Sequence, residues 1–134
     1  MSIDATVAEV FVYTGAGGAE IPQDVVRVRV DPSVMSIPIG KFYQRKKLIE
    51  VELCEGLVEI GESSFTWCEC SLTKINIPSS LKRIGDDAFI CSLRAPIRLH
   101  DGIESIGEGA FANCIFTNFR IPPHNTLIPN HILN

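Results

Sequence analysis

The sequence lacks the features of proteins that cross membranes or bind nucleic acids. It has 134 residues, and no stretch approaches the roughly 20 consecutive apolar residues that span a bilayer. Twelve Lys and Arg against 16 Asp and Glu give a net charge of -4, so no attraction to nucleic acid or to anionic membrane is expected. The one basic run, residues 45–47, is shorter than functional basic tracts and is expected to be a solvated loop.

Export and disulfide signals are also missing. The N-terminus has no basic segment and carries Asp4 and Glu9, which is not typical of a secretory signal. Five cysteines cannot all pair within one chain, so reduced thiols and an intracellular location are favoured. Cys68, Cys91 and Cys114 are expected to be small buried residues in one column. The single C-x-C at Cys68 and Cys70 lacks a second pair, so no metal site is predicted.

Repetition is what the sequence does have. Five isoleucines recur at intervals of 23, 24, 22 and 22 residues, namely Ile37, Ile60, Ile84, Ile106 and Ile128. Three residues before each lies an apolar residue, namely Val34, Leu57, Leu81, Ile103 and Leu127. Five residues after each lies a large one, namely Phe42, Phe65, Phe89, Phe111 and Leu133. Such recurrence indicates a repeat protein.

One unit, residues 72–91, shows the expected local structure. Apolar and polar residues alternate over "LTKINIP", which predicts a short strand that Pro78 ends. A second extended segment follows, and Gly85 is expected to turn the corner with a positive φ. Residues 86–91 predict about one helical turn, with Asp86 facing backbone N–H groups at its start.

One unit cannot bury its own apolar face, whereas stacked units can. We therefore predict a solenoid over residues 25–134 of about five coils of 22–24 residues, the last incomplete. Parallel strands lie on one face, with short extended segments and single helical turns on the other. Residues 1–24, with a strand at 10–13 and a Gly-rich turn, are expected to form an N-terminal cap.

The pattern LxxIxIPxxLxxIGxxAFxxC, almost complete in residues 72–91 with Cys91 one place early, resembles the BspA-like leucine-rich repeat. The resemblance extends from Val25 to the end of the chain. Departures include Pro38 and Pro129 where other coils have glycine, and an extra residue before the strand in "SLRAPIRL". The resemblance implies a binding or scaffold function, no catalysis and no cofactor. Known members are typically surface and adhesion proteins, so a cell-surface adhesin or a fragment of one is the alternative.

Solenoids usually bind partners through the outer side of the strand sheet, which directs attention to its outward residues. Arg29 and Glu52 are expected to pair across neighbouring strands, and so are Glu50 with Arg27 and Lys74. Arg98 and Arg120 lack a partner in their row, and with His100 beside them they form a small positive patch for an acidic partner. Trp67 lies past the phenylalanine column, as a partner anchor or packed on its own loop.

These observations favour a non-catalytic protein-interaction or scaffold module whose protein partner the sequence does not specify. An enzyme would need a pocket of convergent polar groups, which thin coils filled by side-chain columns do not leave. The last coil carries no polar cap, so two expectations stay open. The edge serves self-association, or the chain is a fragment of a longer array.

Overall fold

The computed structural model describes residues 9–15, 17, 20–116, 118–122, 129, 132 and 133, which are organised as short parallel strands. Each of the later coils contributes one strand to each of two walls. The strands are β1 (Val10–Tyr13), β2 (Arg27–Val30), β3 (Ser36–Ile37), β4 (Glu50–Glu52), β5 (Glu59–Ile60), β6 (Lys74–Ile75), β7 (Arg83–Ile84), β8 (Ile97–Arg98), β9 (Ser105–Ile106) and β10 (Phe119–Arg120).

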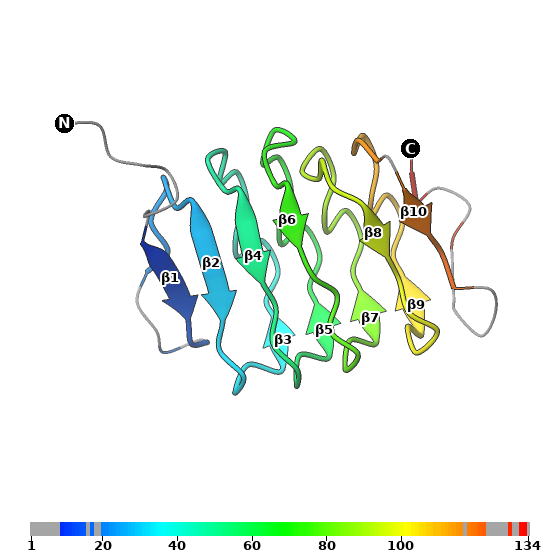
Figure 1. The fold of residues 1–134 in the computed structure, drawn as a ribbon, viewed down its shortest axis with the longest axis horizontal. Helices are drawn as coiled ribbons and strands as arrows, with labels where there is room; N and C mark the ends of the chain where they lie inside the picture. The colour runs from blue at the N-terminus through cyan, green and yellow to red at the C-terminus, as the bar shows by residue number, and fades with distance from the viewer. Residues whose placement is uncertain are drawn as a thin grey trace.

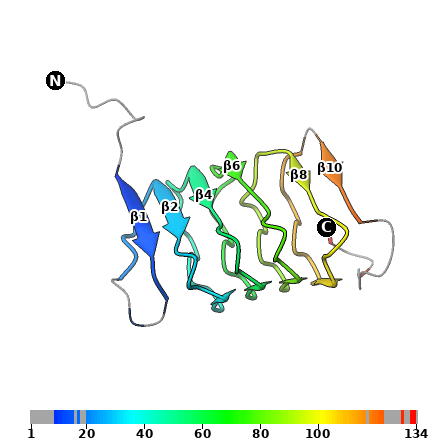
Figure 2. The ribbon, with the colours of Figure 1, turned by 60° about the horizontal axis from the view of Figure 1, so that its bottom comes forward.

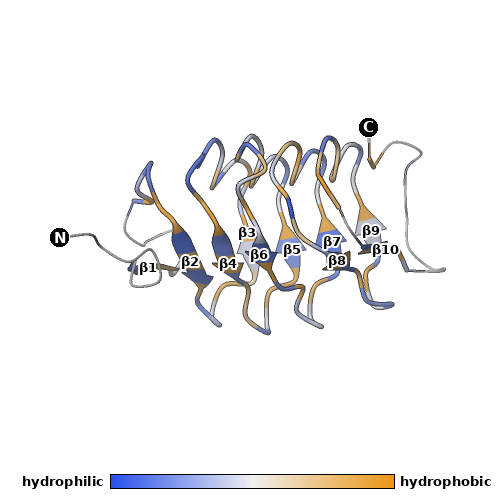
Figure 3. Cartoon of the chain, turned by 45° about the horizontal axis from the view of Figure 1, so that its top comes forward, coloured by the Kyte–Doolittle hydropathy of each residue, from blue (hydrophilic) through white to orange (hydrophobic). Residues whose placement is uncertain are grey.

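The strands form two walls of a solenoid, and β1 and β10 lie at opposite ends (Figures 1 and 2). The first wall has the order β1-β2-β4-β6 and continues with the pair β8-β10, whereas the second wall has the order β3-β5-β7-β9. All pairings are parallel. Colouring by hydropathy shows hydrophilic residues on β2 and β4 beside hydrophobic segments of the same coils (Figure 3). This architecture confirms the predicted solenoid.

Columns of equivalent side chains fill the interior. In the second wall Ile37, Ile60, Ile84 and Ile106 are register partners of one another and are buried. The residues three positions earlier, from Val34 to Ile103, are buried as well. Ile128 and Leu127, expected in the same columns, lie outside the described residues.

The phenylalanine column is a continuous aromatic stack. Ring centroids of Phe42, Phe65, Phe89 and Phe111 are 5.0, 5.2 and 5.5 Å apart, with interplanar angles of 1°, 1° and 6°. Tyr13 ends the stack edge-to-face at one end, with its ring centroid 5.7 Å from that of Phe42. Aromatic rings favour such offset and edge-to-face contacts.

At the other end of the stack, the expected column member Leu133 is 46% exposed. Phe116 and Phe119 instead contact Phe111 edge-to-face, with centroids 6.0 and 5.2 Å away. Phe111 N donates to Ile132 O at 2.8 Å, as Phe89 N does to Ala110 O, so the backbone of Leu133 takes the predicted column position while its side chain is half-exposed. The two rings from the preceding segment provide the larger apolar surface against Phe111.

A glycine column lets the coils stack closely. A Cβ at Gly61, Gly85 or Gly107 would come within 2.5, 2.7 or 2.4 Å of the preceding coil's backbone. None of the three has a positive φ, so the positive φ predicted at Gly85 is wrong. In the first coil this position is Pro38, directly after β3 at the edge of the second wall, and no described backbone of an earlier coil pairs with β3. Proline is tolerated at such an edge because it needs no ladder partner for an N–H.

The segment after each second-wall strand is a series of turns, and the described residues contain no helix, so the predicted helical turns are wrong. Its N–H groups alternate between the same coil and the next. Ala88 donates to Gly85 O at 3.3 Å, whereas Phe89 donates to Ala110 O at 2.8 Å. In a helix, both N–H groups would donate to carbonyl oxygens of the same coil. Residues with positive φ permit this alternation, among them Ser63, Trp67, Asp87, Cys91 and Asn113.

Strand β1 has the expected bounds and extends the first wall by pairing with β2. Parts of the Gly-rich turn, residues 16, 18 and 19, lie outside the described residues. Arg45 fixes the following segment, because its guanidinium donates to Ile21 O and to Gln23 Oε1, both at 3.2 Å. Lys46 pairs with Glu69 at 3.3 Å. Within the basic run, Arg45 and Lys46 are thus structural contacts and not only a solvated loop.

The first wall is interrupted between β6 and β8, where the chain carries its extra residue. The two strands lie side by side in Figure 1, yet no strand pairing joins them among the described residues. Pro96, directly before β8, has no N–H to donate to the ladder. The bridges Leu72–Leu93 and Arg94–Ile115 keep the neighbouring coils in register.

Candidate interaction surface

The candidate site is the outer side of the first wall, here called the strand face. It consists of the outward residues of β2, β4, β6, β8 and β10. Four predicted contact residues lie on these strands, namely Arg29, Glu52, Arg98 and Arg120. His100 follows β8, and Trp67 lies outside the strand face, in the connection after β5.

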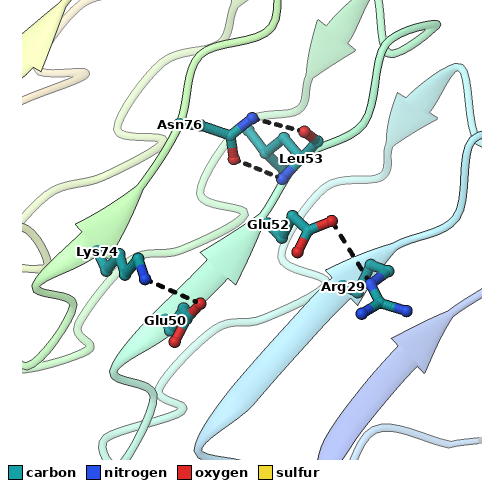
Figure 4. Close-up of polar contacts among 6 residues, drawn as sticks. All are labelled: Arg29, Glu50, Glu52, Leu53, Lys74 and Asn76. Carbon is teal, nitrogen blue, oxygen red and sulfur yellow. Dashed lines mark hydrogen bonds and ion pairs between the residues drawn. The ribbon is translucent and has the colours of Figure 1, made fainter.

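Over β2, β4 and β6, charges on the strand face compensate one another (Figure 4). Arg29 Nε lies 3.5 Å from Glu52 Oε2. Glu50 lies between two cations, 3.3 Å from Arg27 Nε and 3.8 Å from Lys74 Nζ. These pairs are those predicted from the register. They are solvent-exposed to different degrees, so each contributes at most about 1 kcal/mol.

Asn76 continues the first wall where β6 ends. Its side-chain Oδ1 accepts the N–H of Leu53 at 2.8 Å, and its Nδ2 donates to Leu53 O at 2.6 Å (Figure 4). The amide therefore replaces two backbone partners that a longer β6 would supply. This residue is a structural part of the strand face.

Two arginines face outward where the strand face continues over β8 and β10. Arg98 and Arg120 are register partners, so two cations occupy adjacent positions. Arg120 is held by Asp101 Oδ1 at 3.1 Å and by Leu99 O at 2.8 Å. The prediction that Arg120 has no partner considered only the row of outward strand residues. Asp101 lies outside that row, in the turn after β8. Arg98 is exposed, and no carboxylate of the described residues lies within ion-pair distance of it.

His100 is engaged at both ring nitrogens. Its Nδ1 accepts the N–H of Gly102 at 3.0 Å, and its Nε2 lies 3.0 Å from Pro78 O. Because a carbonyl oxygen accepts only, the bond to Pro78 needs the proton on Nε2, and Nδ1 is then the acceptor. In this arrangement the ring is neutral and links two coils. The positive patch beside it consists of Arg98 and Arg120.

Trp67 is 45% exposed and has a φ of 61°. Its N–H donates to Ile90 O of the next coil at 2.9 Å, so its backbone is fixed while its ring reaches solvent. Cys91 and Asn113 occupy the equivalent position in the next two coils. The structure thus places Trp67 in the connection between β5 and β6, whereas Arg98 and Arg120 lie on strands of the first wall.

The cysteines do not form the predicted single column. Cys68, Ser92 and Cys114 are equivalent, because each donates to the carbonyl of a column phenylalanine: Cys68 to Phe42 at 3.8 Å, Ser92 to Phe65, and Cys114 to Phe89 at 2.9 Å. Cys91 lies one position earlier. All five cysteines are free. Within the described ranges, no group of three or more His, Cys, Asp or Glu side chains is arranged to hold a metal ion.

Burial sets the ionisation of the inner thiols. Cys68 is fully buried, and this burial raises the pKa of its thiol to about 11. Burial also raises the pKa of the Cys114 thiol, and nearby Cys70 and Cys91 add to that rise. These thiols stay protonated at neutral pH and serve as weak donors inside the coil stack.

An open groove of about 530 Å³ on the outer side of the second wall was not foreseen from the sequence. Gly85 and Gly107 lie along it. Arg83 lies beside it, in ion pairs with Glu59 at 3.6 Å and with Glu104 at 3.9 Å. Glu62, Asp86 and Glu108 occupy equivalent positions after the column glycines, and Asp86 Oδ1 accepts the N–H of Glu108 at 2.8 Å.

None of the described residues belongs to a helix that is long and apolar enough to cross a membrane.

Parallel strands stacked at a spacing of 22–24 residues, with columns of Ile, Leu and Phe inside, define a leucine-rich-repeat type of β-solenoid. The sequence profile of the BspA type leucine rich repeat region matches residues 23–134 in six copies. The chain therefore belongs to the BspA type leucine-rich repeat family.

Among solved structures, the crystal structure of a leucine rich repeat protein of T. pallidum, TpLRR, is similar. The TM-score is 0.62 at 25% sequence identity, over 69% of this chain and 45% of that chain. This chain thus spans less than half the length of that protein. No curated protein matches the sequence.

Proposed function

We propose that this repeat module is a non-catalytic protein-interaction module that binds an acidic protein surface through Arg98 and Arg120. The observation that carries the proposal is the charge distribution on the strand face. Arg29, Glu52 and Glu50 are in ion pairs, whereas Arg98 is exposed and has no ion-pair partner among the described residues. A partner's carboxylate would find a donor that no internal contact competes for.

Two further observations fit this proposal. The coil interior is filled by the Ile and Phe columns, which supports a function at the surface and not in an internal active site. Five free thiols fit a reducing compartment, so we extend the proposal to an intracellular location in preference to the cell surface.

A site-specific crosslink tests the proposal. A photoreactive side chain replaces the exposed Asn118 directly before β10, and the full chain is irradiated in extract of its own organism. We expect a discrete protein adduct that disappears with Arg98→Glu and weakens with added salt. Lys47→Glu, the same charge change at an exposed site before β4, should leave the adduct unchanged. An adduct indifferent to Arg98→Glu, or none at all, would overturn the proposal.

We also propose self-association through the C-terminal end of the array. Ile121 and Leu133 are large apolar residues that are 36% and 46% exposed there. Sedimentation velocity should show a concentration-dependent larger species that Leu133→Asp abolishes. Ile49→Asp, at an exposed position within the array, should not affect it. A monomer at all concentrations, or equal effects of both substitutions, contradicts this part.

A further inference from the structure

Cys70 lies in the longest coil, where the chain makes an additional excursion. The interval from Ile60 to Ile84 is 24 residues, compared with 22 for the next interval. Glu69 and Cys70 both have a φ of 54°, in addition to the left-handed Trp67 shared with other coils. The extra residues bring Cys70 across the outside of the next coil.

The backbone holds Cys70 against Cys91. Cys70 N donates to Cys91 O at 2.9 Å. The Cys70 α-carbon lies about 1.5 Å from its N and the Cys91 α-carbon about 2.4 Å from its O, so the two α-carbons are at most about 7 Å apart. Disulfides join α-carbons about 4.4–6.8 Å apart. The hydrogen bond therefore holds this pair in the range that a disulfide needs.

The Cys70 side chain extends along the Cys91 coil. Its Sγ lies 3.6 Å from Asn113 O, in the coil beyond Cys91. Cys91 is the link between them, because its own N–H donates to Ala112 O at 2.9 Å. Burial raises the pKa of the Cys70 thiol, and the neighbouring Cys91 adds to that rise.

The remaining thiols differ in their surroundings. Cys68 is buried, and Cys114 points inward to Phe89 O at 2.9 Å. Cys54, Cys70, Cys91 and Cys114 are all partly exposed, and among them Cys70 and Cys91 are joined by a backbone hydrogen bond. A small-molecule reagent can thus reach this pair while the core stays packed.

We propose that Cys70 and Cys91 form a dithiol site that a low-molecular-weight disulfide, such as oxidised glutathione, converts to an intramolecular disulfide. One thiolate attacks a glutathione sulfur and releases one reduced glutathione. The second thiolate then attacks the mixed disulfide, releases the other glutathione, and leaves the Cys70–Cys91 bond. Both cysteine thiols lose their protons and are oxidised, and one oxidised glutathione becomes two reduced ones. The bond fixes the loop that carries Trp67 to the following coil.

The test treats the full-length folded protein with oxidised glutathione and then traps free thiols by alkylation. We expect two fewer alkylated cysteines and a peptide linking Cys70 to Cys91 by mass spectrometry. The fluorescence of Trp67, the one tryptophan of the chain, should fall because a nearby disulfide quenches it. The midpoint of thermal unfolding should rise by roughly 5–10 °C, because the bond shortens the loops of the unfolded chain.

Matched variants separate this site from other thiol chemistry. Cys70→Ser and Cys91→Ser should each abolish the linked peptide and the fluorescence change, and Cys54→Ser should leave both intact. The proposal is overturned if glutathione stays attached as a mixed disulfide, if Cys114 forms the bond, if the bond joins two chains, or if all five thiols stay free.

Discussion

At the residue scale, the glycine column determines how close the coils can lie. A methyl group at Gly61, Gly85 or Gly107 would meet backbone atoms of the preceding coil, which cannot move aside as a flexible side chain can. These glycines are needed for contact distance and not for an unusual φ. The distinction determines what a substitution should do.

Gly85→Ala should lower the free energy of unfolding by about 1–3 kcal/mol, because its Cβ would lie 2.7 Å from Glu62 N. Urea denaturation followed by circular dichroism measures the change. Gly17→Ala is the matched control, because no heavy atom lies within 4 Å of its added Cβ. Equal stability of the two variants would show that the coils are further apart than described.

Cys68 makes stability depend on pH. Burial raises its pKa from 9.0 to about 11, so the folded state keeps a proton that the unfolded state loses first. The contribution is fully present below pH 9, and it is lost as the pH rises toward 11, by about 3 kcal/mol in total.

Cys68→Ser checks this contribution, because Ser92 already occupies the equivalent position and donates to a column carbonyl. The difference in unfolding free energy between parent and variant should change in the variant's favour between pH 8.5 and 10.5, a window that brackets the lower part of this titration. A difference that stays constant over this range would contradict the assigned pKa.

The apolar columns could be predicted from the sequence because each member recurs at a fixed spacing and type. The left-handed residues could not. Trp67 and Cys91 have positive φ, which neither residue type favours. Both residues occupy the same position in their coils, where the backbone N–H donates to the next coil. The positive φ follows from that contact between coils, which the sequence pattern does not contain.

At the scale of the element, the short strands depend on partners from outside their own hydrogen-bond ladder. Strand β6 has two residues, and the side chain of Asn76 then completes the pairing with Leu53. The turns also depend on neighbouring coils, because their N–H groups donate alternately to a carbonyl of the same coil and to one of the next coil. Local propensity alone favoured a helical turn at 86–91, because it does not include these contacts between coils.

Asn76→Ala should lower the free energy of unfolding by about 1–3 kcal/mol, since it removes two hydrogen bonds to a partly buried backbone. Lys74→Ala on the same strand removes only an exposed ion pair of 3.8 Å and should cost less than about 1 kcal/mol. Chemical denaturation of both variants measures the two losses in the free energy of unfolding. A larger loss for Lys74→Ala would contradict the role given to the amide.

The predicted rows of the strand face were correct wherever pairing follows strand register, as for Arg29 with Glu52. Register could not reveal the contact between Arg120 and Asp101, because Asp101 lies in a turn. It also could not show that His100 is used by two backbone partners. Contacts between a strand residue and a turn residue depend on the geometry of the turn, and the spacing of residues in the sequence does not determine that geometry.

At the scale of the whole molecule, the aromatic stack runs through successive coils and ends in edge-to-face contacts with Tyr13 and Phe116. Phe89→Ala should lower the free energy of unfolding by about 3–5 kcal/mol, because it opens a cavity between two stacked rings. Leu133→Ala, at a half-exposed position, should change it by at most about 0.5 kcal/mol. Calorimetry of the two variants tests this, and similar losses would place Leu133 in the stack after all.

Removal of residues 1–24 should cause aggregation. The deletion takes away Tyr13, which covers Phe42, and strand β1, which pairs with β2. An apolar end and an open strand edge then face solvent. Static light scattering of the purified deletion variant measures the result, and a soluble monomer would contradict the predicted capping role.

Pro38 limits where further coils can be added to the array. Duplication of an internal coil places one glycine against the next and preserves the close fit. A coil added before β3 would lie against the ring of Pro38, at the position where the other coils have a glycine without a side chain. Its carbonyl group would also lack a donor, because proline has no backbone N–H. Engineered lengthening should therefore succeed by insertion between existing coils, and extension at the leading end needs Pro38→Gly first.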